Sequence, residues 1–229
     1  MRQSTKLILL VVIVLILDQW FKIWVKTNME YNQEIAIMGL SWAKLRFIEN
    51  NGMAFGFSMG GHYGKLFLSV FRIIAVSGLI YFISFLIKNK ASKGMLISFA
   101  LILAGAIGNI IDSAFYGMIF SESPYHGGLA EIFPEQGGYS GFLYGKVVDM
   151  LYFPIAQGRL PEWFPFWPNR QVLFLRAVFN LADLYITVGV LSTIIFHRSF
   201  FQNDLQKIED ATSLTGDAEE NSEPELNSN

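Results

Sequence analysis

The segment VFNLADLYITVG, residues 178–189, decides the class of fold, because it has the composition of a membrane helix and still carries Asn180 and Asp183. An ionisable side chain at the centre of a bilayer costs about 2.5–3.5 kcal/mol on insertion scales, and such residues usually face a partner or a site. No basic residue stands three or four positions before or after Asp183, so its own helix offers no ion pair. Asp183 is therefore the first candidate functional residue.

The composition of the whole chain agrees with a membrane protein. Of 229 residues, 52% are hydrophobic and only 16% are charged, which is typical of a polytopic membrane protein. The net charge of −2 argues against a nucleic-acid partner. The chain has no cysteine, which excludes a thiol nucleophile, a cysteine-ligated zinc and any disulfide.

Four stretches are long and apolar enough to cross a bilayer, which takes about 20 residues. They cover about residues 5–25, 65–87, 94–116 and 172–197. The first begins like a signal peptide, but no small-x-small cleavage site follows it, so we expect an uncleaved span. The predicted fold is an all-α membrane protein, a four-transmembrane-helix bundle that forms a single membrane domain over residues 1–203.

The basic residues predict the orientation of these spans. The connection KNKASK at 88–93 holds three Lys, and further Lys or Arg residues precede the first span and follow the last, so these regions and both termini should be cytoplasmic. The loops at about 26–64 and 117–171 then face outward. Loose alternation at 34–48 predicts a small extracytoplasmic β-rich cradle. The aromatic and proline-rich segment 150–170 predicts a loop or helix lying on the membrane surface, and the acidic residues 204–229 predict a disordered cytoplasmic tail.

The polar residues of the spans fall at a common depth. A helix rises about 1.5 Å per residue, and counting from the cytoplasmic ends places each of them in the outer half of a hydrocarbon core about 30 Å thick. Asp149 lies in the outer loop ahead of the last span and can reach the same level. The polar residues that converge on this layer are Asp18, Lys22, Asn109, Asp112, Asn180 and Asp183.

Several of these residues also have a structural interpretation. Asp18 and Lys22 are four residues apart and can neutralise each other, Asn109 and Asn180 can form interhelical hydrogen bonds, and Asp112 can be interfacial. The sequence contains no HExxH metalloprotease motif and no serine in a nucleophile-elbow context with a histidine at matching depth. Carboxylate chemistry and carboxylate-mediated transport remain.

A pair of aspartates in such a layer can hydrolyse a peptide bond. Two carboxylates held close in a low-dielectric site cannot both ionise, so the pair shares a proton. The ionised member takes a proton from water, while the protonated member donates to the carbonyl oxygen and later helps the amine to leave. This chemistry needs no metal and no cofactor.

Five sequence blocks resemble those of bacterial lipoprotein signal peptidase, also called signal peptidase II. They are LDQWFK (17–22), NNGMAFG (50–56), GAIGNIIDS (105–113), VVDMLYF (147–153) and FNLADLYI (179–186), in the order of that family. The resemblance spans about residues 17–190. It implies an aspartic endopeptidase of the bacterial inner membrane, with its active site at the outer leaflet, that removes signal peptides from diacylglyceryl prolipoproteins by cutting just before the lipidated cysteine.

The resemblance also implies roles for single residues. The catalytic pair would be Asp149 and Asp183. The substrate-binding or site-lining positions would be Asp18, Lys22, Asn50, Gly52, Asn109, Asp112 and Asn180. The expected partners are prolipoprotein substrates, membrane lipid and globomycin-type inhibitors, and we expect a monomer.

Three departures from the family pattern stand out. Ser113 occupies a position where the family often has Arg, so a basic contact is missing or comes from elsewhere. Leu184 stands where a small residue is usual and would narrow the packing beside the pair. The stretch 113–145 is long and predicts an added outer flap.

Two other functions are alternatives to the peptidase. One is a proton- or ion-coupled transporter that uses intramembrane aspartates, and the other is a non-catalytic membrane scaffold.

Overall fold

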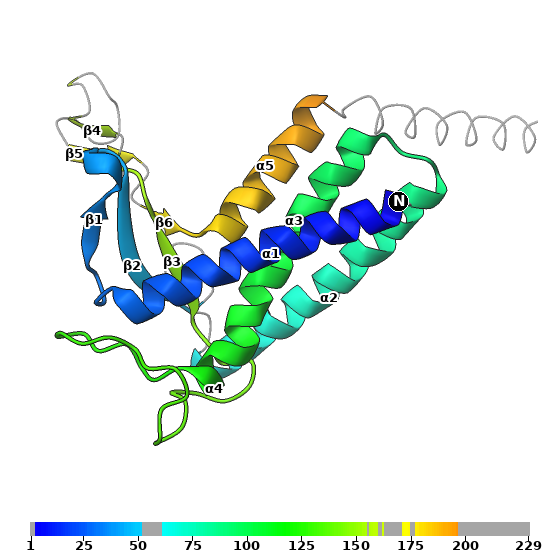
Figure 1. Cartoon of the computed structure of the whole chain (residues 1–229). Helices are drawn as coiled ribbons and strands as arrows, with labels where there is room; N and C mark the ends of the chain where they lie inside the picture. The colour runs from blue at the N-terminus through cyan, green and yellow to red at the C-terminus, as the bar shows by residue number, and fades with distance from the viewer. Residues whose placement is uncertain are drawn as a thin grey trace, which may run out of the picture.

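The computed structural model describes residues 3–51, 61–154, 156–159, 162, 171–174 and 177–196. Apolar helices make up one part of the molecule, and a small antiparallel sheet lies beside the C-terminal end of α1 (Figure 1). Gly52, the predicted tail 204–229 and most of the aromatic segment predicted to lie on the membrane surface are outside the described residues.

Among the described residues, three helical stretches are long and apolar enough to cross a membrane. Helix α1 runs over Gln3–Asn28, α2 over Gly61–Lys88 and α3 over Lys93–Ile111. Helix α3 continues through a π-helical turn, Asp112–Tyr116, into the short α4, Gly117–Ile119. The hydroxyl of Ser92 caps α3 by accepting a hydrogen bond from the Met95 N–H at 3.2 Å. Apolar helices therefore stand where the first three spans are predicted.

The fourth predicted span begins too early. Helix α5 covers only Leu181–Phe196, and two strands precede it, β5 at Gln171–Phe174 and β6 at Val178–Phe179. A short apolar run can be a buried strand as easily as a helix segment, so composition alone could not separate the two. The helix starts after Asn180, which has the side chain of a helix N-cap.

The predicted β-rich cradle is a small antiparallel sheet. Strands β1 (Glu34–Ala36), β2 (Lys44–Asn50), β3 (Val147–Tyr152) and β6 pair in the order β1-β2-β3-β6. Strand β4 (Ala156–Arg159) pairs with β5 in a separate hairpin. In the main sheet Ile48 lies opposite Asp149, and Leu151 opposite Phe179. The β3–β6 pairing brings the outer loop directly to the start of α5.

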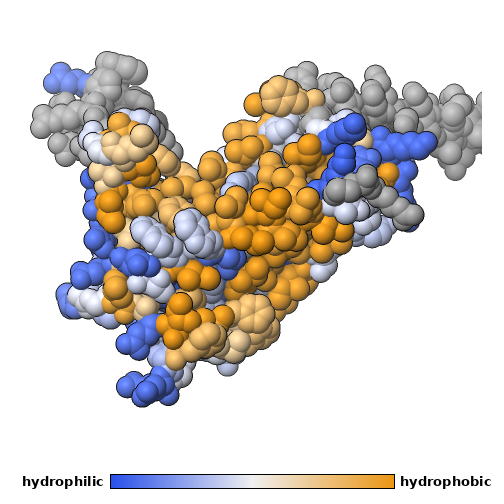
Figure 2. Space-filling view, viewed as in Figure 1, coloured by the Kyte–Doolittle hydropathy of each residue, from blue (hydrophilic) through white to orange (hydrophobic). Residues whose placement is uncertain are grey.

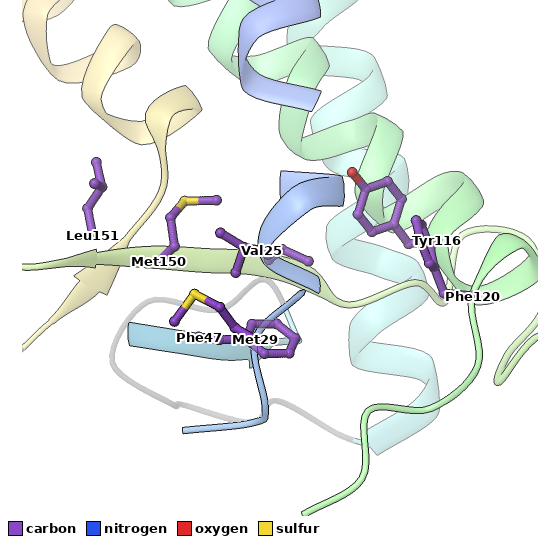
Figure 3. Packing of buried hydrophobic residues seen from close by; sticks show 8 residues of the cluster. Val25, Met29, Phe47, Tyr116, Phe120, Met150 and Leu151 are labelled. Atoms are coloured by element: carbon purple, nitrogen blue, oxygen red, sulfur yellow. The ribbon is translucent and has the colours of Figure 1, made fainter. Parts of the chain in front are cut away.

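A hydrophobic cluster joins the sheet to the helices (Figure 3). Its side chains come from the end of α1, from β2 and β3, and from the segment that follows α3, so each of these elements is fixed against the others. Burial of such side chains contributes about 1.5–3 kcal/mol each. The buried members are Val25, Met29, Phe47, Tyr116, Phe120, Val148, Met150 and Leu151.

The surface of the helices is apolar. Figure 2 shows a continuous hydrophobic region over the helices, with hydrophilic residues gathered at the sheet and at the opposite end of the molecule. Most side chains of α2 that the structure describes are exposed or only partly buried, including Phe67, Ile74 and Tyr81. Exposed apolar surface of this extent marks a lipid or protein contact, which fits a membrane protein.

Residues 120–146, called the outer segment below, pack against the C-terminal end of α1 and the end of β2. Lys26 is fully buried, pairs with Glu49 and donates to the Ser123 hydroxyl at 2.9 Å. Lys146 lies 3.6 Å from Glu49 and 3.2 Å from Glu122. These contacts fasten the outer segment, most of the predicted outer flap, to β2 next to Asn50.

Candidate active site

The FNLAD motif forms a reciprocal cap at the start of α5. The Asp183 N–H donates to Asn180 Oδ1 at 2.9 Å, and the Asn180 N–H donates to Asp183 Oδ2 at 3.4 Å. This is the geometry of a capping box, in which the N-cap and the third helical residue satisfy each other's backbone donors. The cap fixes the direction in which the Asp183 carboxylate leaves the helix.

Asn180 also reaches the second aspartate. Its Nδ2 donates to Asp149 Oδ1 at 2.7 Å. Because Asn180 Oδ1 accepts from a backbone N–H, which can only donate, the amide group has no choice of orientation. Asn180 therefore contacts the carboxylates of both Asp149 and Asp183.

Asp149 lies in the middle of β3 and is only 4% exposed. A second amide, Nδ2 of Asn50 at the end of β2, donates to Asp149 Oδ2 at 3.2 Å. Burial raises the pKa of Asp149 to about 7, and the nearby charge of Asp183 adds to the rise, against the lowering effect of the two asparagine amides. A carboxyl group with such a pKa can hold or release a proton near neutral pH.

Asp183 receives its other hydrogen bond from α3. Asn109 Nδ2 donates to Asp183 Oδ1 at 2.8 Å, and Asn109 Oδ1 accepts from Lys22 Nζ at 3.0 Å. Lys22 can only donate, so it sets the orientation of the Asn109 amide. A continuous chain of contacts thus runs from α1 through α3 to the start of α5.

Lys22 is the centre of a buried ion cluster. Its ammonium lies 3.0 Å from Asp18 and 2.9 Å from Asp112, and all three side chains are at most 2% exposed. Asp18 Oδ1 accepts the Ala182 N–H at 3.0 Å, and Asp112 Oδ2 accepts the Val148 N–H at 3.3 Å. The cluster therefore holds the residues next to both Asp183 and Asp149.

The structure brings together nearly every residue selected from the sequence. The spacing-based pair of Asp18 and Lys22 is confirmed. Asn109 makes the expected interhelical hydrogen bonds, whereas Asn180 bonds the strand residue Asp149 and Asp183 of its own helix. Gly52 lies outside the described residues. The predicted site residues found in one connected network are Asp18, Lys22, Asn50, Asn109, Asp112, Asp149, Asn180 and Asp183.

Two residues of this layer were missed by the sequence analysis. Gln19 donates to Asp112 Oδ1 at 2.9 Å and to Asp18 Oδ2 at 3.1 Å. Arg72 on α2 donates from Nη1 to the Ser113 hydroxyl at 3.4 Å, and its charge acts on Asp183, Asp112 and Asp149. Gln19 carries no charge and gave no signal, whereas a lone Arg inside an apolar span is itself a signal of function.

Ser113 and Leu184, the two single residues that depart from the family pattern, occupy different environments. Ser113 is only 3% exposed and donates to the Asn109 carbonyl at 3.0 Å, so the basic group that reaches its position comes from α2. Leu184 is 38% exposed. It lies outside the buried layer, and the predicted narrowing beside the pair finds no support in this placement.

The arrangement defines a class of protein: a polytopic membrane protein with a buried layer of carboxylates and amides. Comparisons with known proteins identify its family. The family model described as Signal peptidase (SPase) II matches residues 10–200. The chain therefore belongs to the signal peptidase II family, the lipoprotein signal peptidases.

Individual relatives cover most of the chain. The lipoprotein signal peptidase of Porphyromonas gingivalis is 46% identical over 187 residues, which are 81% of this chain and 80% of that protein. The lipoprotein signal peptidase of Amoebophilus asiaticus is 41% identical over 203 residues, or 87% of this chain and 80% of that protein. The comparisons give no support to the transporter alternative.

Solved structures share the fold. One, titled as a bacterial membrane enzyme, is 25% identical, with a TM-score of 0.57 over 87% of this chain and 91% of that chain. A second of the same description is 26% identical, with a TM-score of 0.54 over 83% of this chain and 91% of the other.

Proposed function

We propose that this lipoprotein signal peptidase is an aspartic endopeptidase whose catalytic groups are Asp149 and Asp183. Members of its family remove signal peptides from prolipoproteins. The proposed substrate is a prolipoprotein that already carries diacylglycerol on a cysteine, and the bond cut is the one just before that cysteine. No metal or cofactor takes part, so a chelator should leave the activity unchanged.

One observation carries the proposal: Asn180 contacts both carboxylates, that of Asp149 through its side-chain amide and that of Asp183 through its backbone N–H. A single residue that donates to Asp149 and caps Asp183 holds the two acids in a fixed relation. The raised pKa of Asp149, about 7, adds a group able to donate a proton near neutral pH. A base and an acid held close together are what water-mediated peptide hydrolysis requires.

The chemical steps follow from one shared proton. The ionised carboxylate takes a proton from water as the water oxygen bonds to the peptide carbonyl carbon, and the protonated carboxyl donates to the carbonyl oxygen. In the second step the amine nitrogen receives the proton that water gave up, the C–N bond breaks, and the other carboxyl regains its proton from the tetrahedral intermediate. Atoms and charge balance, and the pair returns to its starting state.

The other predicted site residues divide into two groups. Asp18, Lys22 and Asp112 are at most 1% exposed, so we assign them to holding the pair in place rather than to touching the substrate. Asn50 is assigned the same holding role, because its side-chain amide donates to Asp149. Gly52, which comes from the block shared with the family, is proposed to line the substrate path.

The membrane setting is part of the proposal. Helix α5, at about 24 Å for 16 residues, would serve as the fourth span of a bundle in the bacterial inner membrane. Lys88, Lys90 and Lys93 mark the cytoplasmic end with both termini, and the sheet and the aspartate pair lie toward the outer leaflet. A monomer that takes lipid-anchored substrates and binds globomycin-type inhibitors from that leaflet fits this placement.

The test is a gel-shift cleavage assay on purified full-length protein with a diacylglyceryl prolipoprotein. Asp149→Asn and Asp183→Asn should each lower the rate at least about 100-fold, the scale of a lost general acid or base. Glu131→Gln, which removes an exposed carboxylate of the outer segment, is the matched control and should cleave normally. Full activity in either aspartate variant would show that the substituted residue is not a member of the catalytic pair. Globomycin should inhibit the wild-type protein.

A further inference from the structure

Lys26, Glu49 and Lys146 form a second group of charged residues, which the proposed chemistry does not use. None of the three lies in the sequence blocks that resemble those of the family. The Lys26 ammonium is fully buried, pairs with Glu49 and donates to the Ser123 hydroxyl at 2.9 Å. The Glu49 side chain is only 3% exposed and lies 3.6 Å from the Lys146 ammonium. One carboxylate therefore connects the C-terminal end of α1, strand β2 and the outer segment.

Aromatic rings complete the surroundings of the two ammonium groups. Lys26 Nζ lies 5.4 Å from the ring centroid of Phe120 and 5.2 Å from that of Tyr139, and Lys146 Nζ lies 5.4 Å from the same Tyr139 ring. The Tyr139 hydroxyl also accepts the Lys146 N–H at 2.6 Å. A cation is attracted to the face of an aromatic ring, most strongly where water is excluded. The outer segment is thus fixed to the Glu49 carboxylate by charges and rings together.

Glu49 belongs to the short part of β2 that ends in Asn50. The register between β2 and β3 shifts just before this part, and the pairs that follow the shift are Ile48 with Asp149, Glu49 with Val148 and Asn50 with Val147. Such an irregularity interrupts the regular ladder of hydrogen bonds. Asn50 is the last residue of the strand, and the ends of elements fray where few contacts hold them. The contacts of Glu49 supply an anchor at this strand end.

The two faces of β2 carry different contacts here. Successive side chains of a strand point to opposite faces, so Asn50 shares a face with Ile48 and Glu49 takes the other. Because Ile48 is the partner of Asp149, Asn50 lies diagonally across from that aspartate, and its Nδ2 donates to Asp149 Oδ2 at 3.2 Å. Fixing Glu49 on one face therefore fixes the backbone from which the Asn50 amide reaches the aspartate on the other.

We propose that Glu49 is a positioning residue: held by Lys26 and Lys146, it fixes the end of β2 so that the Asn50 amide stays on Asp149. The inference deepens the proposed function and rests on it. A buried ion pair adds little net stability over apolar side chains, and its best-attested use is to fix one register. The outer segment, which supplies Lys146 and two of the rings around Lys26, then supports catalysis without touching the substrate.

A double-mutant cycle on kcat tests this proposal in the gel-shift cleavage assay with the full-length protein. Asn50→Ala should lower kcat about 10- to 100-fold, the factor carried by a lost hydrogen bond to a charged group. Glu49→Gln should lower kcat about three- to tenfold and change KM less than about twofold, because a displaced amide misplaces a reacting group without removing substrate contacts. In the Asn50→Ala background, Glu49→Gln should have no further effect, since the amide through which it acts is gone.

A general loss of stability gives a different result. A smaller folded fraction lowers the rate by the same factor whether or not Asn50 is present. Equal factors for Glu49→Gln in the two backgrounds, or an unchanged kcat in Glu49→Gln, would therefore overturn the proposal. The matched control is Glu34→Gln, which removes the partner of Lys44 on the same sheet and should leave kcat and KM unchanged in both backgrounds.

Lys146→Gln decides where Glu49→Gln does not fold. The Lys146 side chain is 23% exposed, so its loss is the milder change, and it should lower kcat at least about twofold in the wild type and not at all in the Asn50→Ala background. Equal factors in both backgrounds would overturn the proposal. Full activity in Asp149→Asn would overturn the proposed function as well, whereas an inactive Asp149→Asn beside equal factors would overturn the positioning role alone.

Discussion

Asn180 and Asp183 cap the same helix end reciprocally, each backbone N–H meeting the other residue's side-chain oxygen at 3.4 and 2.9 Å. A candidate catalytic carboxylate is thereby also a structural part of its helix. The amide of the capping residue continues to Asp149 at 2.7 Å, so the helix start and the aspartate pair are a single unit.

The two roles of Asn180 can be separated by substitution. Asn180→Ser keeps an oxygen for the cap but is too short to reach Asp149, so stability should stay near wild type while cleavage falls at least about tenfold. Asn180→Ala also loses the cap and should cost a further 1 kcal/mol or so. Thermal unfolding and the cleavage assay on the same samples measure the two effects. Equal loss of stability in both variants would contradict the capping role.

The raised pKa of Asp149 predicts a pH-dependent stability. The folded protein holds this proton up to a pH of about 7, whereas the unfolded chain releases it near about 3.9. The stabilisation from this group is therefore complete below the lower value and is lost as the pH rises through the upper one. Relative to wild type, Asp149→Asn should therefore gain thermal stability as the pH rises from about 4 to about 7, which thermal unfolding followed by tryptophan fluorescence measures.

The matched control for this measurement is Glu131→Gln, whose carboxylate is exposed. Its stability difference from wild type should be independent of pH. A constant difference for Asp149→Asn over the same range would mean that Asp149 is not the group that holds the proton.

Close packing of α3 against α5 depends on glycine. A Cβ at Gly105 would clash with the Ala182 carbonyl oxygen and lie 2.8 Å from Ile186 Cγ1. Gly105→Ala should therefore displace the start of α5, lower stability by about 1–3 kcal/mol and abolish cleavage. Gly78→Ala on α2, where a Cβ meets nothing within 4 Å, is the control and should be neutral or stabilising by up to about 1 kcal/mol. Similar behaviour of the two variants would disprove the tight contact.

The buried Lys26–Glu49 pair should matter more than an exposed pair on the same sheet. Glu49→Gln leaves Lys26 buried without its carboxylate, and breaking a buried pair costs about 3–5 kcal/mol. Glu34→Gln removes the partner of Lys44 and Arg46 at a site about one third exposed, where less than about 1 kcal/mol is expected. Limited proteolysis should cut the outer segment faster in Glu49→Gln only. Protection equal to wild type would show that other contacts hold that segment.

The sequence was sufficient for features that depend on local properties. The first three apolar helices follow from apolar length, and the common level of Asn109 and Asp183, which are hydrogen-bonded, follows from the regular rise of a helix. The place of Asp149 could not be obtained in this way, because it depends on strand pairing opposite Ile48 and on a hydrogen bond from Asn50, which is 99 residues away in the sequence. Without the family resemblance, Asp149 was interpreted as an ordinary loop aspartate. Only that resemblance selected it as a member of the catalytic pair.

Other misses have equally specific causes. The start of α5 was placed too early because strands and membrane helices share an apolar composition. Lys26 was assigned to the beginning of an outer loop. No feature of the neighbouring sequence indicates that Glu49 and the aromatic rings of Phe120 and Tyr139 enclose its side chain. Arg72 was overlooked although it interrupts an apolar span, and the depth count used for the other helices would have found it.

The pairing of β3 with β6 has a consequence for biosynthesis. Asp149 comes from the strand β3 and Asp183 from the last helix the structure describes, and the two meet only after Leu151 has paired with Phe179. A chain that enters the membrane N-terminus first thus carries α1, α2 and α3 before the proposed catalytic pair can form. That pair is therefore assembled only late in synthesis, once α5 has been made and β6 has joined the sheet.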